Sequence, residues 1–577
     1  MDNRVVLNDA FKQFTMDQDK ILAPQETVKR FKKRLAELDL NILEKTTRID
    51  NGRLGIPIYF SVCGPDAASV TGTAKQMGKG ATPAQSEASA VMELAERFSF
   101  FAFKKDEANF FTDTYRNVKE KALSFDLIAQ SVHDSSDDLP LAKEIFSDLP
   151  LKWTKAFNLT RQQEVLIPFD WFFMINEFNG PSAGNCVEEA LSQGICEIIE
   201  RHVSAIVSHG KLKVPAIDPE SATDPMVIEM IAKYKKIGVK VFLSDFTLET
   251  GIATVGAMAY DPETFPAKSE IVWTAGTTPD PQKALSRALT EVAQLAGDFN
   301  TSANYVASGL PKFVSLKEAQ YITNAKGKVP IDTLPDLSDN NIKVEVENLI
   351  AALAERGMEI IVINTMHAGL KIPAFYTIIP GAHFRERALG TSVTMFSAKM
   401  IAENNPPAEA IQKLVAIDKA LPGKYYVNFY LGSCHLDNQD PETALTYLEK
   451  ALTFDPNHQD VPSIDSYTGV CLKDMGRYHE AIEVLSKASK LDEERTDVHN
   501  LMGFCHFMLK EHQEAINSFK NVLRLDPTSA IDYANIASNY RDMGKTEAAI
   551  RYYEMALELD ESIEFARNNL AKLQKDA

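Results

Sequence analysis

The last quarter of the chain carries a pattern of apolar and polar residues that is helical and repeats. Small residues recur in three columns of this pattern, and the first column has successive intervals of 37, 34 and 34 residues. Small side chains at fixed positions allow two antiparallel helices to pack closely. The pattern predicts an all-α solenoid of about four helix–turn–helix repeats over residues 425–577. The columns are Gly432, Gly469, Gly503 and Ala537; Ala444, Ala481, Ala515 and Ala549; and Ala451, Ala488, Val522 and Ala556.

Residues 1–400 show a different pattern. Short β-rich runs at 56–62, 240–243 and 359–363 are mixed with helical stretches rich in Ala and Glu. This mixture predicts an α+β body with mixed sheets and packed helices. Residues 401–424 include the proline pair and the Pro-Gly step of the expected linker between the body and the repeat domain.

Three segments of the body share one local arrangement, a glycine-containing turn followed by a helical stretch that bears carboxylates. Gly80 precedes Glu93 by the same interval as Gly184 precedes Glu197. Residues i, i+3 and i+4 share one face of a helix, and most positions between the carboxylates are apolar. We therefore expect packed helices whose carboxylates face a shared interior cleft. The segments are 78–97, 182–201 and 274–294.

The carboxylates of two such helices define candidate chemistry. Brought together, Glu93, Glu96, Glu197 and Glu200 would raise one another's pKa values unless cations neutralised them. Carboxylate oxygens suit Mg²⁺, and Mg²⁺ in turn suits polyphosphate, for which the nearby arginines are natural partners. The alternative is that each Glu-x-x-Glu-Arg forms an exposed salt-bridge ladder on a solvated helix. Neither of the usual glycine-rich phosphate loops is present.

The charge balance narrows the classes of function. The chain of 577 residues has 61 Lys and Arg against 80 Asp and Glu, a formal charge of −19. This excess argues against a nucleic-acid-binding protein, because phosphate binding needs a basic surface. Residues 421–577 hold 16 basic and 26 acidic residues. The repeats therefore either favour a basic protein partner or present an acidic solvated face.

Targeting signals and cysteines point to a cytoplasmic protein without membrane attachment. No apolar run approaches the roughly 20 residues of a membrane span, and the first residues do not have the pattern of a signal peptide. The six cysteines are too few for a disulfide framework. A thiol nucleophile among the body cysteines is the less favoured alternative, since no histidine pairing is evident. Three cysteines follow the glycine column of the repeats and are expected to be buried: Cys434, Cys471 and Cys505.

Four ordered motifs resemble those of the YcaO family, ATP-dependent enzymes that modify backbone amides. The resemblance extends over most of residues 1–385, and the repeats resemble tetratricopeptide repeats. The motifs are Ser-x-x-x-Glu-x-x-Glu-Arg at 89–97, Asn-Gly-x-x-Ala-Gly-Asn to Glu-x-x-Glu-Arg at 179–201, Arg-Ala-Leu-Thr-Glu-x-x-Gln at 287–294, and a terminal strand ending at 379–381.

The resemblance implies ATP and Mg²⁺ as cofactors and assigns roles to residues of the motifs. Lys20 and Thr27 correspond, through a shorter match, to a lysine and a serine that reach the nucleotide. The implied metal ligands are Glu93, Glu96, Glu197 and Glu200. The implied nucleotide-binding residues are Lys20, Thr27, Ser89, Asn185, Glu189, Arg201, Arg287 and Glu291, and the implied catalytic residues are Glu93, Glu197 and Arg287.

The chemistry implied by the resemblance is phosphorylation of an amide oxygen in a peptide or protein substrate. The chain ends without the proline-rich tail common in azoline-forming members. We therefore favour protein thioamidation, or an accessory role in methylthiolation of a small-subunit ribosomal protein. The alternatives are an azoline-forming cyclodehydratase, a carboxylate–amine ligase, and an adaptor whose repeats bind a partner while the body is inactive. A homodimer is among the states that the sequence leaves open.

Overall fold

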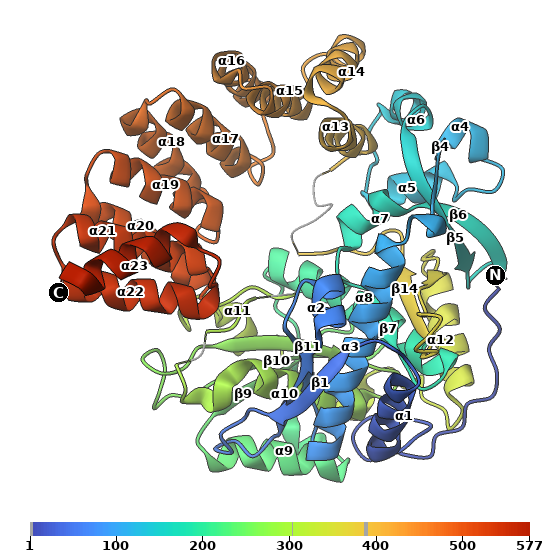
Figure 1. Ribbon diagram of the computed structural model, residues 1–577. Helices are drawn as coiled ribbons and strands as arrows, with labels where there is room; N and C mark the ends of the chain where they lie inside the picture. The colour runs from blue at the N-terminus through green and yellow to red at the C-terminus, as the bar shows by residue number, and fades with distance from the viewer. Residues whose placement is uncertain (1–3, 303, 308, 386–390, 577) are drawn as a thin grey trace. The chain divides into compact units, whose positions relative to one another are not determined.

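The protein consists of two compact units in a computed structural model that describes residues 4–302, 304–307, 309–385 and 391–576. The first unit is Met1–Val393 and the second is Thr394–Ala577. The first is the mixed α/β body expected from the sequence, and the second is all-helical, so the predicted fold class is confirmed. Figure 1 shows the elements of each unit.

The boundary between the units differs from the expected linker. Residues 401–424 contain a helix, α14 (Pro407–Ala420), which follows α13 (Val393–Asn404) in the second unit. α14 buries Ala410, Leu414 and Ile417 and packs against α15 (Tyr425–Asp437). Proline is tolerated in the first turn of a helix, where its missing N–H has no intrahelical partner. The proline pair therefore marks a helix start and not a flexible connection.

The strands of the body form three sheets within the described residues. The first, antiparallel, has the order β1-β2-β3, and the second has the order β11-β10-β9-β8-β12. The third has the order β4-β5-β13-β14-β7, with β6 also paired to β5. The strands are β1 (Leu43–Arg48), β2 (Ile58–Cys63), β3 (Lys75–Lys79), β4 (Phe111–Thr114), β5 (Pro150–Asn158), β6 (Gln163–Pro168), β7 (Pro181–Ala183), β8 (Ala216–Ile217), β9 (Lys240–Asp245), β10 (Thr254–Tyr260), β11 (Val272–Thr277), β12 (Lys328–Val329), β13 (Ile361–Asn364) and β14 (Ala374–Ile378).

The three glycine-containing segments each fold as a strand or its end followed by a long helix. β3 leads into α3 (Pro83–Lys105), β7 into α8 (Val187–His209), and β11 into α10 (Pro281–Ala296). Gly78, Gly184 and Gly276 lie directly against the backbone of the helix that follows. A Cβ atom on Gly78 would stand 2.1 Å from the Ala90 nitrogen, so only glycine permits this approach.

These three helices interlock the three sheets. α3 packs on β3 and also on β7 and β14, whereas α8 packs on β14 and β7 and also on β11. α10 packs on β11 and β10 and also on β3. Each helix thus covers the sheet of its own segment and touches the sheet of another. This arrangement brings α3, α8 and α10 around one interior space.

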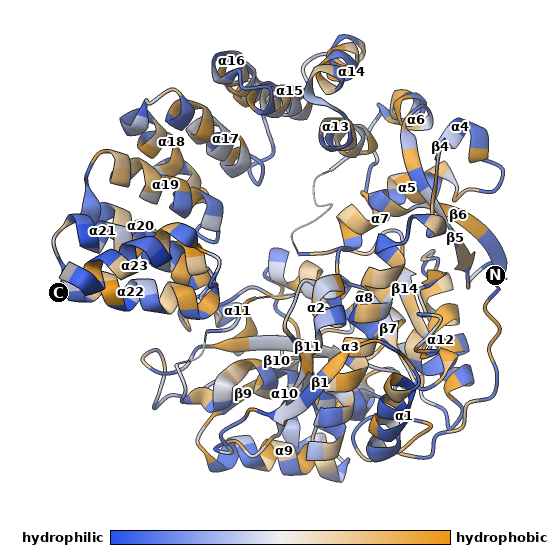
Figure 2. Ribbon diagram, viewed as in Figure 1, coloured by the Kyte–Doolittle hydropathy of each residue, from blue (hydrophilic) through white to orange (hydrophobic). Residues whose placement is uncertain are grey.

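The strands β11 and β14 are more buried than the helix α1. β11 and β14 are buried at every residue, whereas α1 (Pro24–Ala36) buries only Pro24, Thr27, Val28 and Phe31. Figure 2 shows α1 as mainly hydrophilic. None of the described helices is both long and apolar enough to cross a membrane.

The second unit has the packing that the repeat columns predict. The alanines of all three columns are 0% exposed, and Val522 is 3% exposed. A Cβ atom on Gly432, Gly469 or Gly503 would stand within 2.8 Å of a side chain of the paired helix. Cys434, Cys471 and Cys505 are buried, as expected. The helices are α15, α16 (Pro441–Leu452), α17 (Val461–Asp474), α18 (Tyr478–Leu491), α19 (Thr496–Met508), α20 (His512–Leu525), α21 (Ala530–Asp542), α22 (Thr546–Leu559) and α23 (Glu564–Asp576).

Candidate nucleotide and metal site

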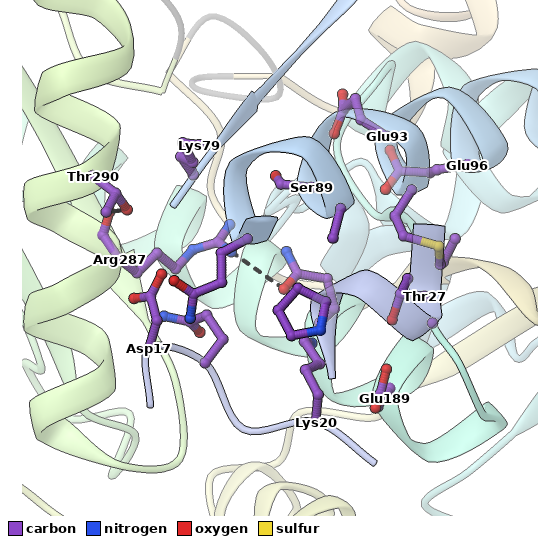
Figure 3. Close-up of a pocket in the computed structure, with 18 of the residues that line it drawn as sticks. Asp17, Lys20, Thr27, Lys79, Ser89, Glu93, Glu96, Glu189, Arg287 and Thr290 are labelled. Carbon is purple, nitrogen blue, oxygen red and sulfur yellow. Dashed lines mark hydrogen bonds between the residues drawn. The ribbon is translucent and has the colours of Figure 1, made fainter. Parts of the chain in front are cut away.

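A pocket of about 410 Å³ lies in the body where α3, α8 and α10 meet. The segment before α1, α1 itself and β3 complete its wall. Figure 3 shows Glu93 and Glu96 on α3 across the pocket from Arg287 and Thr290 on α10. The structure brings every predicted site residue to this pocket: Lys20, Thr27, Ser89, Glu93, Glu96, Asn185, Glu189, Glu197, Glu200, Arg201, Arg287 and Glu291.

The α3 side of the pocket holds two carboxylates and an arginine. Arg97 Nε lies 3.1 Å from Glu93 Oε1 and 3.6 Å from Glu96 Oε1. Burial and the neighbouring charge of Glu93 hold the pKa of Glu96 well above its ordinary value, although Arg97 acts in the opposite direction. The single guanidinium of Arg97 therefore does not neutralise both Glu93 and Glu96.

The α8 side of the pocket is bonded to the β11–α10 segment. Glu200 accepts a hydrogen bond from the backbone N–H of Thr277 at 3.1 Å and pairs with Arg287 Nε at 3.0 Å. Burial raises the pKa of Glu197. Arg287 also donates from Nη1 to Gln193 Oε1 at 3.2 Å, the bond drawn in Figure 3. Glu200 and Gln193 therefore orient the Arg287 guanidinium at the pocket wall.

Two buried N–H donors at the pocket have no hydrogen-bond partner among the described residues. They are Arg201 Nε and Gln85 Nε2. The carbonyl oxygen of Gln85 is engaged in the N-terminal cap of α3, where it accepts from the Thr82 N–H at 3.0 Å. Buried donors are normally satisfied. Both groups are therefore available to a polar or anionic ligand in the pocket.

Glu189 has a structural task at the pocket's edge. Its carboxylate accepts from the Ile21 N–H at 2.7 Å, and from the backbone and side-chain nitrogens of Asn185 at 2.9 and 3.0 Å. The Glu189 residue is only 3% exposed. It fixes Asn185 and the segment before α1, so it acts here by positioning other residues of the predicted site.

Two further residues, Lys79 and Asp17, line the pocket but were not among the predicted site residues. Lys79 ends β3, pairs with Glu291 and lines the pocket, and burial together with the charge of Arg287 lowers its pKa to about 7. Its only sequence signal was the Gly-Lys-Gly step. Asp17 is 2% exposed, accepts from the Ala81 N–H at 2.8 Å and bonds Ser286. It lies outside any periodic segment, and so no pattern could have indicated it.

A family model described as YcaO cyclodehydratase, ATP- and Mg²⁺-binding, matches residues 77–383, which is more than half of the chain. The chain belongs to the YcaO family. The predicted cofactors, ATP and Mg²⁺, are the ligands by which this family is described. Models of tetratricopeptide repeats match residues 426–458 and 494–562, which confirms the repeat domain.

Several curated proteins are similar to this YcaO protein. An uncharacterized protein of Methanothermobacter thermautotrophicus is 28% identical over 377 residues, which cover 62% of this chain and 93% of the relative. The ribosomal protein S12 methylthiotransferase accessory factor YcaO of Escherichia coli is 31% identical over 142 residues, which cover 24% of each chain. The first similarity covers nearly the whole relative, whereas the second is local.

Two solved structures share the fold of the YcaO body. One is YcaO from Methanopyrus kandleri bound with AMPPCP and Mg²⁺, with a TM-score of 0.50 and 21% identity over 65% of this chain and 95% of that one. The other is a heterocyclase in complex with substrate and cofactor, with a TM-score of 0.52 and 20% identity over 66% of this chain and 55% of that one.

The donors at the YcaO pocket fit a divalent cation that arrives with a polyphosphate. No three His, Cys, Asp or Glu side chains in the described part of the chain are arranged to hold a metal by themselves. Arg97 and Arg287 instead pair with the carboxylates. Mg²⁺ usually takes one or two carboxylates, substrate phosphates and water. A cation beside Glu96 would also relieve the repulsion that raises its pKa.

The cysteines near the pocket do not have the properties of nucleophiles. Cys186 caps α8, where its sulfur accepts from the Glu189 N–H at 3.4 Å. Burial and the charge of Glu189 raise the pKa of Cys186 to about 12. Burial likewise raises the pKa of Cys196 to about 12. A thiolate is the reactive form, so neither thiol is activated.

Proposed function

We propose that this YcaO protein uses ATP and Mg²⁺ to activate a backbone amide of a peptide or protein by phosphorylating the amide oxygen. The observation that carries the proposal is the composition of one pocket. It gathers carboxylates on α3 and α8, the guanidiniums of Arg201 and Arg287, and the amines of Lys20 and Lys79. Phosphoryl transfer requires acidic residues that bind a metal ion and basic residues that bind the phosphates.

The proposed reaction balances without a redox partner. A hydrosulfide ion, or a thiol or hydroxyl that gives up its own proton, adds its electron pair to the amide carbon, and the carbonyl oxygen becomes an oxyanion. The oxyanion attacks the γ-phosphorus of ATP, and the bond to the leaving ADP breaks. The carbon–oxygen bond then breaks, phosphate departs with the electron pair, and the adduct loses a proton. Phosphorylation is needed because an amide oxygen is otherwise a very poor leaving group.

The residues of the pocket divide this work. One or two of the carboxylates of Glu93, Glu96, Glu197 and Glu200 would hold a Mg²⁺ ion together with the triphosphate, and the ion would neutralise charge on the triphosphate. Arg287, oriented by Gln193 and Glu200, is placed to stabilise charge that develops on the transferred group. Among these, Glu93, Glu197 and Arg287 are the proposed catalytic residues.

Among the products of such chemistry, we favour a thioamide or a contribution to methylthiolation of a small-subunit ribosomal protein. The local similarity to the Escherichia coli accessory factor supports the second assignment. Hydrosulfide as nucleophile replaces oxygen with sulfur, whereas a cysteine or serine side chain of the substrate closes an azoline ring. The family description as cyclodehydratase keeps azoline formation as the alternative.

The proposal predicts that Glu197→Gln abolishes Mg²⁺-dependent binding of ATP, because it removes one of the carboxyl groups that line the pocket. Isothermal titration of the purified protein with ATP and Mg²⁺ measures this. Glu87→Gln is the matched control: Glu87 lies on α3 and pairs with Lys32 at 3.2 Å, away from the pocket lining. Equal ATP affinity in wild type and Glu197→Gln would refute the proposed site.

The product is identified with the same variants in the native host. Mass spectrometry of host proteins should find a peptide that is modified with the wild-type and Glu87→Gln proteins but unmodified with Glu197→Gln. A gain of about 16 mass units identifies sulfur in place of oxygen, and a loss of about 18 identifies a ring. ATP binding without any such modified peptide would argue against amide activation.

A further inference from the structure

The second unit contains two adjacent cavities, of about 310 and 460 Å³, that share Asn500 as a lining residue. Residues of α17, α19, α20 and α21 line the larger cavity, and residues of α19, α20, α21 and α23 line the smaller. We call these two cavities together the repeat groove. It runs across successive repeats, so a ligand that fills it must be extended.

The smaller cavity is an aromatic pocket with an amide rim. Phe504, Phe507, Phe519 and Phe565 line it. Phe504 and Phe565 are each 40% exposed and line the same pocket, so together they form an exposed aromatic surface. The rim carries the carboxamides of Asn500, Asn535 and Asn569, whose polar atoms can bond a peptide backbone. Asn539 also lines the pocket, but it is 1% exposed and is bonded to His512 and to the Asn535 carbonyl.

The larger cavity is acidic. Asp497, Asp526 and Asp532 line it, and no lysine or arginine does. Asp532 is 2% exposed and accepts from two neutral donors, Asn500 Nδ2 at 2.7 Å and Ser529 Oγ at 2.6 Å. Asp526 accepts from the N–H and hydroxyl of Thr528. Asp497 pairs with Arg495 at 2.7 Å. The cavity therefore keeps net negative charge.

We propose that the repeat groove binds an extended polypeptide segment of a partner protein, with a Lys or Arg side chain in the acidic cavity and a Leu or Phe side chain in the aromatic pocket. The carboxamides between them bond the partner's backbone. A second copy of this chain is disfavoured as the occupant, because residues 421–577 hold 26 acidic against 16 basic residues and two such units repel. The proposal does not rest on the activity of the body.

Fluorescence anisotropy with the full-length protein tests this. The probes are labelled, alanine-based peptides that carry one Lys and one Leu at several spacings, and matched peptides with Glu for Lys or Ser for Leu. We expect saturable binding at one or more spacings, weakened by salt, and at least tenfold weaker binding of both matched peptides. Equal binding of the Glu peptides, or binding of none, would overturn the proposal.

Variants assign that binding to the groove. Phe504→Ala removes an exposed wall of the aromatic pocket, and Asp526→Asn removes charge while it retains an acceptor for the Thr528 N–H. Each substitution should weaken binding of the Lys–Leu peptide about tenfold. Leu491→Ala and Asp474→Asn are controls, since both residues lie in the repeats outside the groove lining. If the groove variants bind as the controls do, with ATP binding intact in all, the groove is not the site.

Discussion

Burial sets the acid–base properties of two groups at the pocket. Burial and the charge of Glu93 raise the pKa of Glu96, and burial and the charge of Arg287 lower the pKa of Lys79 to about 7. Both shifts have the direction that desolvation imposes on a charged group. A cation beside the Glu96 carboxyl would favour its charged form, and so would a phosphate beside the Lys79 amine, which already pairs with Glu291. The free pocket is thus poised for an ion pair that arrives from outside.

Lys79 gives a prediction about protons. With a pKa of about 7, it is mostly neutral at about pH 8 and mostly charged at about pH 6. A bound triphosphate favours the ammonium and raises this pKa, so binding at about pH 8 takes up close to one proton more in wild type than in Lys79→Met. At about pH 6 the difference vanishes. Calorimetric titration in buffers of different ionisation enthalpy counts these protons.

Lys75→Met is the control for this measurement. Lys75 lies on the same strand, and its ammonium stands 4.3 Å from the centre of the Phe60 ring, away from the pocket lining. It should take up as many protons as wild type. Equal proton uptake in wild type and Lys79→Met at both pH values would show that Lys79 does not meet the phosphates.

At the scale of elements, the site depends on how closely strands approach helices. Gly78, Gly184 and Gly276 each place a strand or its end against the backbone of α3, α8 or α10. These contacts fix the positions of the helices, and therefore the positions of the carboxylates and arginines that line the pocket. Glu200 of α8 adds a link to the third segment, because it bonds both Thr277 at the end of β11 and Arg287 on α10.

Gly78→Ala is expected to destabilise the body. Its Cβ would stand 2.1 Å from the Ala90 nitrogen and 2.4 Å from the Ser86 oxygen, and backbone atoms cannot move aside as a side chain can. We expect a loss of about 3 kcal/mol and a fall of about 5 °C or more in the melting temperature of the body, measured by scanning calorimetry. Gly210→Ala is the control, because there the nearest atom belongs to the movable Leu212 side chain. Similar melting temperatures for both variants would contradict this account.

At the scale of the whole molecule, the nucleotide pocket and the repeat groove lie in different units. The residues that line the nucleotide pocket all lie in Met1–Val393, and those that line the repeat groove all lie in Thr394–Ala577. Nothing in either lining requires the other unit.

A truncated protein of residues 1–393 should therefore bind ATP and Mg²⁺ with an affinity within about threefold of the full chain. The same truncated protein should not bind the Lys–Leu peptide. Titration calorimetry and anisotropy measure the two affinities, and circular dichroism checks that the truncated protein is folded. A folded truncation that no longer binds ATP would mean that the repeats contribute to the nucleotide site.

Much of the architecture follows from the sequence because its signals are local. The repeat columns, the three glycine–helix segments and the carboxylates on α3 and α8 are periodic features, and periodicity along a helix specifies which residues share a face. The site residues predicted on these helices consequently reach one pocket, and so do Lys20 and Thr27, which were predicted from the family resemblance. Only at 401–424 did local signals mislead, since a proline pair can begin a helix as well as end one.

The sequence by itself determined which helices carry the acidic and basic groups and where small residues must pack. The tertiary structure alone decided which partners those groups have. Glu189 holds the segment before α1 through Ile21, Asp17 reaches Ala81 and Ser286, and Lys79 meets Glu291. The groups in each of these contacts are far apart along the chain and follow no period, so only the folded arrangement of three sheets around three helices brings them together.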